Sequence, residues 1–453
     1  MSKVLIVDDD AAVTNYLMVF LMQTERYDSV VVNDSRAAMA SLTQAQFDAI
    51  LLDMDMPHIS GIDILQAVHD QRLGIPVIVL TGVGDVELAV RAMKLGAFDY
   101  LTKPVDEDTL LKVLDDAIKH KTLKHSISQL PAELRKEDLA HSEAFAHFPT
   151  QDPSVIRLYH EAEQMAAGDF CIFIWGERGT YKEMLAHAMH GVSPRRNGPF
   201  VSVDAAARGL ERFPAEFFGQ ARDWSGAREE TPGLVEQAAG GTLFLDEIDL
   251  LSIPVQVRLK RIIQTGEFYR ENSTEILRAD VRFIVASHHD LTQEYYKDAF
   301  SRDLLYHLML NSLRIPALHE RINDIPLLAD YFLKAEAGRV GKKIGVVAPE
   351  LIELLKQYDF SDNVRELHSI LAAAVMNENR DILTLDSLPR HVRETITQAR
   401  DEKARGFRPR KLVEIEREHV SRMLAYFRND RPKAAEALGM SVEEMDAILA
   451  GNR

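Results

Sequence analysis

Short apolar runs alternate with amphipathic segments over residues 1 to about 120. Val86–Leu95 is one such segment, because its apolar positions recur every three or four residues as on one face of a helix. A series of β-α units of this length predicts a parallel sheet with helices on both faces. The expected strands are Val4–Val7, Ser29–Val32, Ala49–Leu52, Val77–Leu80 and Asp99–Leu101.

A second region of strand-length apolar runs begins after a polar, His-rich segment, residues 121–150, which predicts a linker. Residues 151–318 predict a second α/β domain, and residues 319–390 predict a helical subdomain attached to it. The expected strands of this second domain are Cys171–Trp175, Phe200–Val203, Thr242–Leu245 and Val281–Ala286.

The end of the chain predicts a small all-α domain, residues 411–453. Residues 391–410 are charged and contain Gly406 and Pro409, so they predict a second linker. An amphipathic helix over Leu412–Phe427 is expected next, then a short helix from Pro432 to Leu438. Ser441 follows a Gly-Met turn and is a suitable N-cap for a last helix.

Composition narrows the class of protein. The formal net charge of −17 disfavours attraction to nucleic acid over the whole surface, although it leaves room for a small DNA-reading module at one end. The apolar runs are too short for a membrane span, and the chain enters a strand directly, without a signal-peptide pattern. We therefore expect a cytoplasmic protein with no membrane partner. Cys171, the single cysteine, lies in an apolar run and is expected to be a buried structural thiol.

Polar side chains follow four of the strands of the first domain, at the edge where parallel sheets bind ligands. A phosphorylatable aspartate needs carboxylates that bind Mg²⁺, a cation that stabilises developing charge, and a hydroxyl that bonds the phosphate. Asp8, Asp9 and Asp53 fit the metal ligands, with Asp53 as the phosphate acceptor. Lys103 fits the cation and Thr81 the hydroxyl. A surface acidic cluster is the alternative, but five matching residue types at strand ends favour the phosphate site.

Residues 1–120 resemble the receiver domain of two-component response regulators over its full length. The resemblance is carried by Asp53-Met54-Asp55-Met56-Pro57, Leu80-Thr81-Gly82 and Tyr100-Leu101-Thr102-Lys103-Pro104. It implies a flavodoxin-like fold and phosphotransfer from a histidine kinase to Asp53. Tyr100 is the expected switch residue, moving between exposed and buried positions. Lys103-Pro104 is expected to be a constrained bend, and a cis peptide bond would suit it.

A glycine-containing loop follows the first strand of the second domain and reads Gly176-Glu177-Arg178-Gly179-Thr180-Tyr181-Lys182. Because such loops point backbone N–H groups at phosphates, its residues are expected to bind nucleotide, chiefly Gly176, Gly179, Thr180 and Lys182. Tyr181 stands where a second glycine is expected, at a position that favours a positive φ. The run Leu243–Glu247 predicts the matching acidic strand, with Asp246 holding Mg²⁺ and Glu247 activating water.

Residues 151 to 370 resemble sigma-54 activators of the nitrogen-regulator type. The matching segments are Gly241-Thr242-Leu243-Phe244-Leu245-Asp246-Glu247-Ile248, Gly266-Glu267-Phe268-Tyr269-Arg270, Asp324-Ile325-Pro326-Leu327-Leu328 and Asn363-Val364-Arg365-Glu366-Leu367. The resemblance implies an AAA+ domain with a helical lid, ATP as cofactor, assembly into a dimer or a higher ring, and sigma-54 RNA polymerase as partner. Arg365 matches the nucleotide-sensing arginine of the lid, and a structural ion pair is an equal alternative.

Several positions depart from that family's pattern. Asp204 and His288 stand where the family has asparagines near the hydrolytic site. Ser301 and His307 stand where it has the two arginines that reach a neighbour's ATP, and Arg302 is placed to replace the first. An arginine supplied by a neighbour stabilises transition-state charge, whereas histidine lacks the fork geometry and is only partly charged. We therefore expect that ATP can bind and that its hydrolysis is impaired.

The loop through which the family contacts sigma-54 is also altered. It reads Arg222-Asp223-Trp224-Ser225-Gly226-Ala227, in which the aromatic, the hydroxyl and the last glycine are kept and the start is lost. We expect this change to weaken the contact with sigma-54.

The run Ala434–Ser441 resembles the helix-turn-helix that ends this family. In such a motif the last helix reads bases in the major groove. Here that helix, Val442–Leu449, carries three acidic residues and no basic one, which disfavours DNA. Basic residues that could contact the phosphate backbone are Arg408, Arg410, Lys411, Arg431 and Lys433. DNA binding and a packing or dimerisation role both stay open.

The sequence favours a response regulator, phosphorylated on Asp53, that regulates transcription by binding DNA or a protein partner rather than by ATP-powered remodelling. One alternative is an ATP-hydrolysing sigma-54 activator with unusual substitutions, which turnover rising on assembly would favour. The other is a phosphorylation-gated protein-interaction regulator that does not bind DNA, which a flat DNA-binding isotherm at low salt would favour.

Overall fold

The computed structural model describes the chain except for residues 45, 83–85, 132, 208–210, 223–229, 294–298, 406–418, 422, 425–430 and 451–453. The chain divides into two compact units, Met1–Ser387 and Leu388–Arg453. Among the described residues, no helix is both long enough and apolar enough to cross a membrane.

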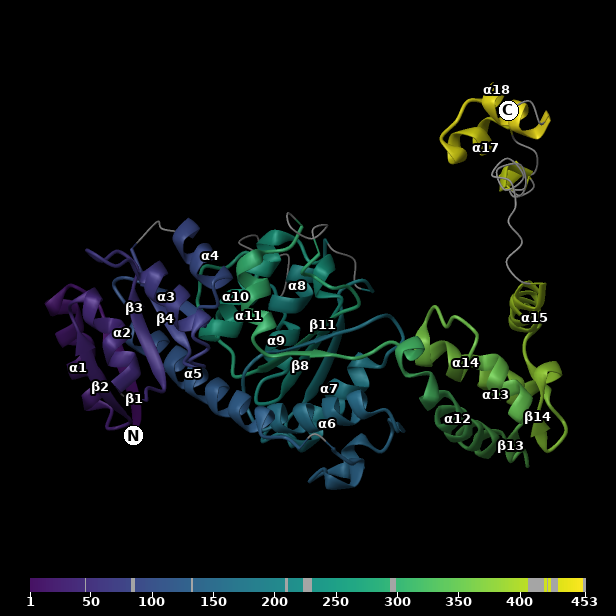
Figure 1. Cartoon of the computed structure of the whole chain (residues 1–453), viewed down its shortest axis with the longest axis horizontal. Helices are drawn as coiled ribbons and strands as arrows, with labels where there is room; N and C mark the ends of the chain where they lie inside the picture. Colours follow the sequence, from purple (N-terminus) through teal and green to yellow (C-terminus); the bar gives the residue numbers. More distant parts are fainter. Residues whose placement is uncertain are drawn as a thin grey trace. The chain divides into compact units, whose positions relative to one another are not determined.

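The first sheet has five strands in the order β2-β1-β3-β4-β5, and they are parallel, as the alternation of the sequence predicts. Its strands are β1 (Ser2–Val7), β2 (Tyr27–Val32), β3 (Ala49–Asp53), β4 (Val77–Thr81) and β5 (Asp99–Thr102). Its helices are α1 (Ala11–Gln23), α2 (Ser35–Gln44), α3 (Gly61–Asp70), α4 (Val86–Lys94) and α5 (Glu107–Ser128). Successive strand residues enter opposite cores: Leu5 and Ile50 pack on one face, Ile6 and Leu51 on the other. Figure 1 shows these elements at the purple and blue end of the chain.

A second five-stranded parallel sheet has the order β12-β6-β11-β8-β7. Its strands are β6 (Ile172–Trp175), β7 (Phe200–Asp204), β8 (Thr242–Asp246), β11 (Arg282–Ser287) and β12 (Ser312–Arg314). The helices of this region are α6 (Pro153–Ala166), α7 (Lys182–Val192), α8 (Phe213–Phe218), α9 (Leu234–Gln237), α10 (Ile253–Thr265) and α11 (Arg302–Met309), and β9 (Glu267–Phe268) pairs with β10 (Leu277–Arg278). The four expected strands are present. β12 was not predicted, because only its middle residue, Leu313, is buried.

Helices α12 (Ile325–Val340), α13 (Pro349–Leu355) and α14 (Asn363–Asn377) form the expected helical subdomain, with the short strand pair β13 (Val346–Val347) and β14 (Ile382–Leu383). In the second unit, α15 spans Arg390–Arg405, where a linker was expected, and α17 (Arg431–Leu438) precedes α18 (Val442–Ala450). Ser441 caps α18 as predicted, since its Oγ accepts a hydrogen bond of 3.1 Å from the Glu444 backbone N–H. Most of the expected helix over residues 412–427 lies outside the described residues.

Candidate phosphorylation and nucleotide sites

Three carboxylates of the first domain meet at one edge of its sheet. Asp8 follows β1, and Asp53 ends the neighbouring strand β3. Ligand oxygens of Asp8, Asp9 and Asp53 all lie within 4.8 Å of one another. Asp8 and Asp53 are buried, whereas Asp9 is exposed, so the cluster opens to solvent on one side. A hard divalent cation such as Mg²⁺ prefers oxygen ligands of this kind, and the residues present therefore fit it.

Lys103 lies between two of these carboxylates. Its Nζ donates a hydrogen bond of 2.7 Å to Asp8 Oδ2 and another to Asp53 Oδ1. Burial, reinforced by the negative charge of Asp8, raises the pKa of Asp53 above its usual value, while Lys103 opposes this shift. Burial alone would lower the pKa of Lys103, but its hydrogen bonds to Asp53 and Asp8 outweigh burial and raise it. The site thus holds a fixed cation against the proposed acceptor carboxylate.

The remaining residues of this edge take up the positions that strand pairing gives them. Thr81 ends β4, directly after Leu80, which pairs with Asp53, and it is 3% exposed. Its Oγ1 donates to the Gly82 carbonyl at 3.3 Å. The Lys103–Pro104 peptide bond is cis, which confirms the expected bend.

Tyr100, the expected switch residue, contacts the second domain. Its hydroxyl donates to Asp303 Oδ2 on α11 at 3.2 Å and accepts from Lys260 Nζ on α10 at 3.3 Å. Lys260 also lies 4.6 Å from the centre of the tyrosine ring, a cation–π contact, and forms an ion pair with Asp303. Sequence reasoning did not find Lys260 or Asp303, because nothing in a single sequence links positions about 160 and 200 residues from Tyr100.

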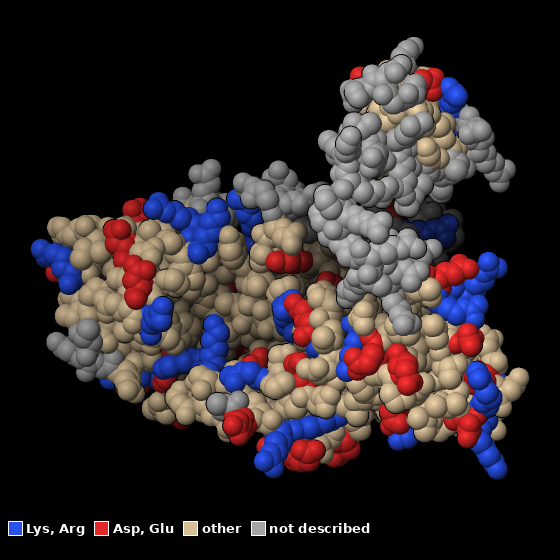
Figure 2. Space-filling model, turned by 45° about the vertical axis from the view of Figure 1, so that its right-hand side comes forward, with Lys and Arg blue, Asp and Glu red and all other residues tan. Residues whose placement is uncertain are grey.

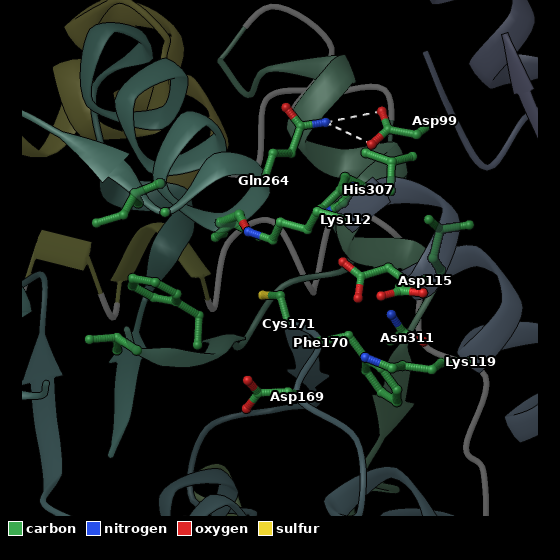
Figure 3. Close-up of a pocket in the computed structure, with 18 of the residues that line it drawn as sticks. Asp99, Lys112, Asp115, Lys119, Asp169, Phe170, Cys171, Gln264, His307 and Asn311 are labelled. Atoms are coloured by element: carbon green, nitrogen blue, oxygen red, sulfur yellow. Dashed lines mark hydrogen bonds between the residues drawn. The ribbon is translucent and has the colours of Figure 1, made fainter. Parts of the chain in front are cut away.

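Asp99, the residue before Tyr100, makes a second link to the same helix. It is 2% exposed, and Gln264 Nε2 of α10 donates to both of its carboxylate oxygens, at 3.0 and 2.9 Å. Figure 3 shows these two bonds at the margin of a cavity of about 280 Å³ that α5, α10 and α11 help to line. Cys171 also lines the cavity, and burial raises the pKa of its thiol to about 12, as expected for an inert structural cysteine.

The glycine-containing loop lies between β6 and α7, and Tyr181 sits at its end in the left-handed region, with φ +66° and ψ +43°. The predicted positive φ is therefore confirmed at a residue whose Cβ makes it unfavourable. Lys182 Nζ bonds the loop itself, donating to the Gly176 carbonyl at 2.8 Å and to the Glu177 carbonyl at 3.2 Å. Thr180 Oγ1 also donates to Glu177, at 2.8 Å.

The start of α14 packs directly on this loop. A side chain at Gly179 would meet the Asp362 carbonyl oxygen at 1.8 Å, so loop and helical subdomain touch through their backbones. Asn363 Nδ2 donates to Glu177 Oε2 at 3.0 Å and to the Arg178 carbonyl at 2.9 Å. The Arg365 backbone N–H donates to the Gly179 carbonyl at 3.2 Å.

For Arg365, the sequence left open a nucleotide-sensing role and a structural ion pair. Its guanidinium Nη1 lies 3.5 Å from Asp362 Oδ1, and its side chain is 61% exposed. In this arrangement Arg365 forms a structural ion pair, one of the two roles expected for it.

The acidic strand β8 ends at Asp246, and Glu247 follows in the left-handed region with φ +55°. Glu247 Oε1 lies 3.5 Å from Arg178 Nη2 and 3.5 Å from His288 Nδ1. Burial raises the pKa of both carboxyls. Burial and the neighbouring His289 lower the pKa of His288 to about 4, so that its imidazole is neutral at physiological pH. The group that faces the expected water-activating glutamate is therefore a neutral imidazole in place of an amide.

Ser301 and His307, which stand where the family has arginines that reach a neighbouring subunit, interact with nearby residues of their own chain. Ser301 caps α11 by accepting from the Leu304 N–H at 3.4 Å. His307 lines the cavity beside Asp99 and Lys112, and burial lowers the pKa of its imidazole. Asp204 is exposed at the end of β7, where its Oδ1 accepts from the Ala206 N–H at 2.8 Å.

Basic residues expected to contact DNA are only partly described. Arg431 donates to both carboxylate oxygens of Asp446 on α18, at 2.7 and 2.8 Å, so an acidic residue of the last helix already pairs with it. Lys433 is exposed on α17. Arg408, Arg410 and Lys411 lie outside the described residues, as does the altered sigma-54 loop over residues 223–227. Acidic and basic side chains are interspersed on the face seen in Figure 2.

Comparison with known proteins matches three consecutive regions. Residues 4–115 match the response regulator receiver domain, residues 148–314 the sigma-54 interaction domain, and residues 319–405 the AAA+ ATPase lid domain. Transcriptional regulatory protein ZraR of Salmonella typhimurium is 33% identical over 99% of this chain and 98% of its own length. Regulatory protein AtoC of Escherichia coli is 31% identical over 97% and 95%. The crystal structure of NtrX from Brucella abortus in complex with ATP is similar over 99% of both chains, at 25% identity and a TM-score of 0.50.

Proposed function

This chain belongs to the NtrC-type response regulators, and from that premise we propose that a histidine kinase phosphorylates Asp53 and that the phosphate controls the contact between receiver and AAA+ domain. The observation that carries the proposal is the cluster of Asp8, Asp9, Asp53 and Lys103 at one sheet edge.

Each side chain of this cluster has a distinct part in the proposed phosphotransfer. Asp8, Asp9 and Asp53 would hold Mg²⁺, which offsets negative charge on the incoming phosphoryl group. A carboxylate oxygen of Asp53 attacks phosphorus while the bond from phosphorus to the donor's histidine nitrogen breaks, giving an acyl phosphate. Lys103 stabilises the charge that develops, and the Thr81 hydroxyl bonds a phosphate oxygen once the product has formed.

The phosphate signal leaves the receiver through Tyr100 in this proposal. Without phosphate, the tyrosine hydroxyl bonds Lys260 and Asp303, and Asp99 bonds Gln264, so that β5 is held on α10 and α11. When Thr81 turns to bond the phosphate, Tyr100 moves toward the space beside it and leaves its partners on the AAA+ domain. The two domains then separate or rearrange, which changes the surface available for dimer or ring assembly.

We further propose that the AAA+ domain binds ATP with little hydrolysis. Related NtrX has been crystallised with ADP and with ATP, which supports binding. Against turnover stand the Tyr181 ring in the phosphate loop, His288 beside Glu247, and Ser301 and His307 where arginines would reach a neighbour. Each missing contact with the transition state removes a part of the rate enhancement, and a trans arginine alone accounts for roughly 10³- to 10⁵-fold in related enzymes.

Transcription is the proposed output, through binding to DNA or a protein partner. The helix–turn–helix arrangement of α17 and α18 supports DNA, whereas the pairing of Arg431 with Asp446 supports a packing role, because it neutralises one of the few basic groups there. DNA titrations at low and high salt with the full chain distinguish the two, since phosphate contacts give a steep salt dependence.

The deciding experiment measures ATP turnover by the full-length protein over a concentration series, with and without beryllofluoride, which mimics phosphate on Asp53. We expect no turnover above background, together with a change of oligomeric state when beryllofluoride is added. Turnover that rises with protein concentration would instead mean that neighbouring chains complete one another's sites. Asp53→Asn is the control, because it removes the acceptor and should abolish the beryllofluoride response.

A further inference from the structure

Two histidines and a buried aspartate meet at the ends of strands β8 and β11, outside the receiver. They are Asp249, in the short turn of 3-10 helix Ile248–Leu250 that follows β8, and His288 and His289, which follow β11. One ligand atom from each lies within 4.8 Å of the other two. Since β8 and β11 are neighbouring parallel strands, the sheet itself fixes the spacing of the group.

The geometry points to a site for a borderline divalent metal ion of the Zn²⁺ class, held by Asp249, His288 and His289. Imidazole nitrogen and carboxylate oxygen are the ligands such ions prefer, whereas Mg²⁺ prefers oxygen alone. In a tetrahedral zinc site with bonds of about 2.0–2.1 Å, neighbouring ligand atoms lie roughly 3.3 Å apart. Asp249 Oδ2 is 3.0 Å from His289 Nδ1, a spacing close to this value.

The aspartate is already oriented as a ligand would be. Its side chain is 2% exposed, and Ser287 Oγ donates to Oδ1 at 2.7 Å, which leaves Oδ2 directed at His289. Ser287 Oγ also accepts from the His289 backbone N–H at 3.0 Å, so one hydroxyl orients two of the three groups. Supporting hydrogen bonds of this kind are typical of metal sites.

His288 supplies the second, independent observation. Its Nδ1 is enclosed and has no hydrogen-bond partner, although a buried polar atom without one is costly. Its ring packs against that of His289, 3.7 Å from centre to centre, so one of the two rings would turn for both to face a single ion. Glu247 Oε1 lies 3.5 Å from the same Nδ1, outside the three-residue group, and would have to move to become a fourth ligand. Arg178, the other partner of Glu247, is 62% exposed and can turn to solvent.

A metal ion here would affect the nucleotide site without being part of it. Glu247 is the residue expected to activate water, and its recruitment as a fourth ligand would remove it from that role. The replacement of the family's amide by His288 would then favour metal binding over ATP hydrolysis at this site.

The test uses tag-free, chelator-treated full-length protein in excess Mg²⁺, so that the carboxylate cluster at Asp53 is occupied. Co²⁺ and Zn²⁺ are added separately, Co²⁺ binding being followed by its visible d–d absorption and Zn²⁺ binding by calorimetry and by displacement of Co²⁺. We expect one site per chain with tetrahedral Co²⁺ absorption. His288→Asn and His289→Gln should each weaken Zn²⁺ binding by about tenfold or more, since even changes outside the ligand set cost about that much.

His319→Asn is the matched control, because His319 is an exposed histidine of the same compact unit that lies outside the cluster. The proposal is overturned if both cluster variants bind Zn²⁺ as the parent does, if His319→Asn weakens binding equally, or if the parent shows no site. His289 is 44% exposed, so His289→Gln tests the site even if the buried positions tolerate no change.

Discussion

Gln264→Met isolates the link between receiver and AAA+ domain. The methionine keeps the length and the helix propensity of glutamine but cannot donate a hydrogen bond. In the parent chain, the Gln264 amide bonds both oxygens of the buried Asp99 carboxylate, whose other bond comes from the Tyr100 backbone N–H at 2.8 Å. The substitution therefore leaves a buried carboxyl group short of a hydrogen-bond donor where the domains meet.

The magnitude follows from the kind of bond that is lost. A hydrogen bond to a charged group contributes about 1.5–3 kcal/mol, and each 1.4 kcal/mol corresponds to a tenfold change in an equilibrium. Gln264→Met should thus shift the balance between docked and separated domains by roughly 10- to 150-fold. Hydrogen exchange of the full-length protein should become faster in α10 and β5, and stay unchanged in buried strands such as β6.

Gln66→Met provides the matched control. Gln66 is also a helical glutamine bonded to an aspartate, with Nε2 2.8 Å from Asp70 Oδ1 on α3, but this bond is exposed to solvent. Its substitution should change stability by no more than about 0.5 kcal/mol. The reasoning is refuted if Gln264→Met leaves exchange in α10 and β5 as it is in the control. Equal acceleration through both sheets would also refute it, because that pattern indicates loss of the whole fold.

Three further predictions concern other parts of the first unit. Lys103→Gln should slow phosphorylation of Asp53 by acetyl phosphate at least about tenfold, because a charge-assisted bond of about 1.5–3 kcal/mol is lost. Gel separation of phosphorylated from unphosphorylated protein measures this rate. An unchanged rate would exclude the proposed role of Lys103. Tyr181→Gly should relieve a left-handed strain of about 1–2 kcal/mol and tighten binding of a fluorescent ATP analogue, whereas weaker binding would show that the ring itself contacts nucleotide. Burial lowers the pKa of His120 to about 4, below its unfolded value near 6.5, so the stability tied to its neutral form is complete above pH 6.5 and is lost as pH falls toward 4. His120→Gln, which can still bond the Leu310 carbonyl, should flatten this loss in denaturant titrations, and an unchanged pH profile would contradict it.

The sequence predicts the two sheets well because their central strands, such as β3, β4 and β8, are mainly apolar runs buried on both faces. It predicts the residues of the receiver edge for a related reason: parallel strands end together, so residues that follow β1, β3, β4 and β5 must approach one another. β12 escaped prediction because one buried residue in three carries no recognisable period.

Contacts between polar groups far apart in the chain were not predictable in the same way. Lys260, Gln264 and Asp303 look like ordinary solvent-facing residues of amphipathic helices, and only the packing of α10 and α11 on β5 gives them partners. The convergence of Asp249 with His288 and His289 is of the same kind, since it depends on the pairing of β8 with β11.

The hydrogen bonds between α14 and the phosphate loop affect the apparent affinity of the AAA+ domain for ATP. Wherever entry of ATP requires those bonds to open, the observed dissociation constant equals the intrinsic one divided by the fraction of molecules already open. Two bonds to carbonyls of about 0.5–1.5 kcal/mol each, and one to the Glu177 carboxylate of about 1.5–3 kcal/mol, would reduce that fraction by roughly 60- to 20,000-fold. The occupancy of the AAA+ domain would then follow how readily its helical subdomain lifts, as well as how much ATP is present.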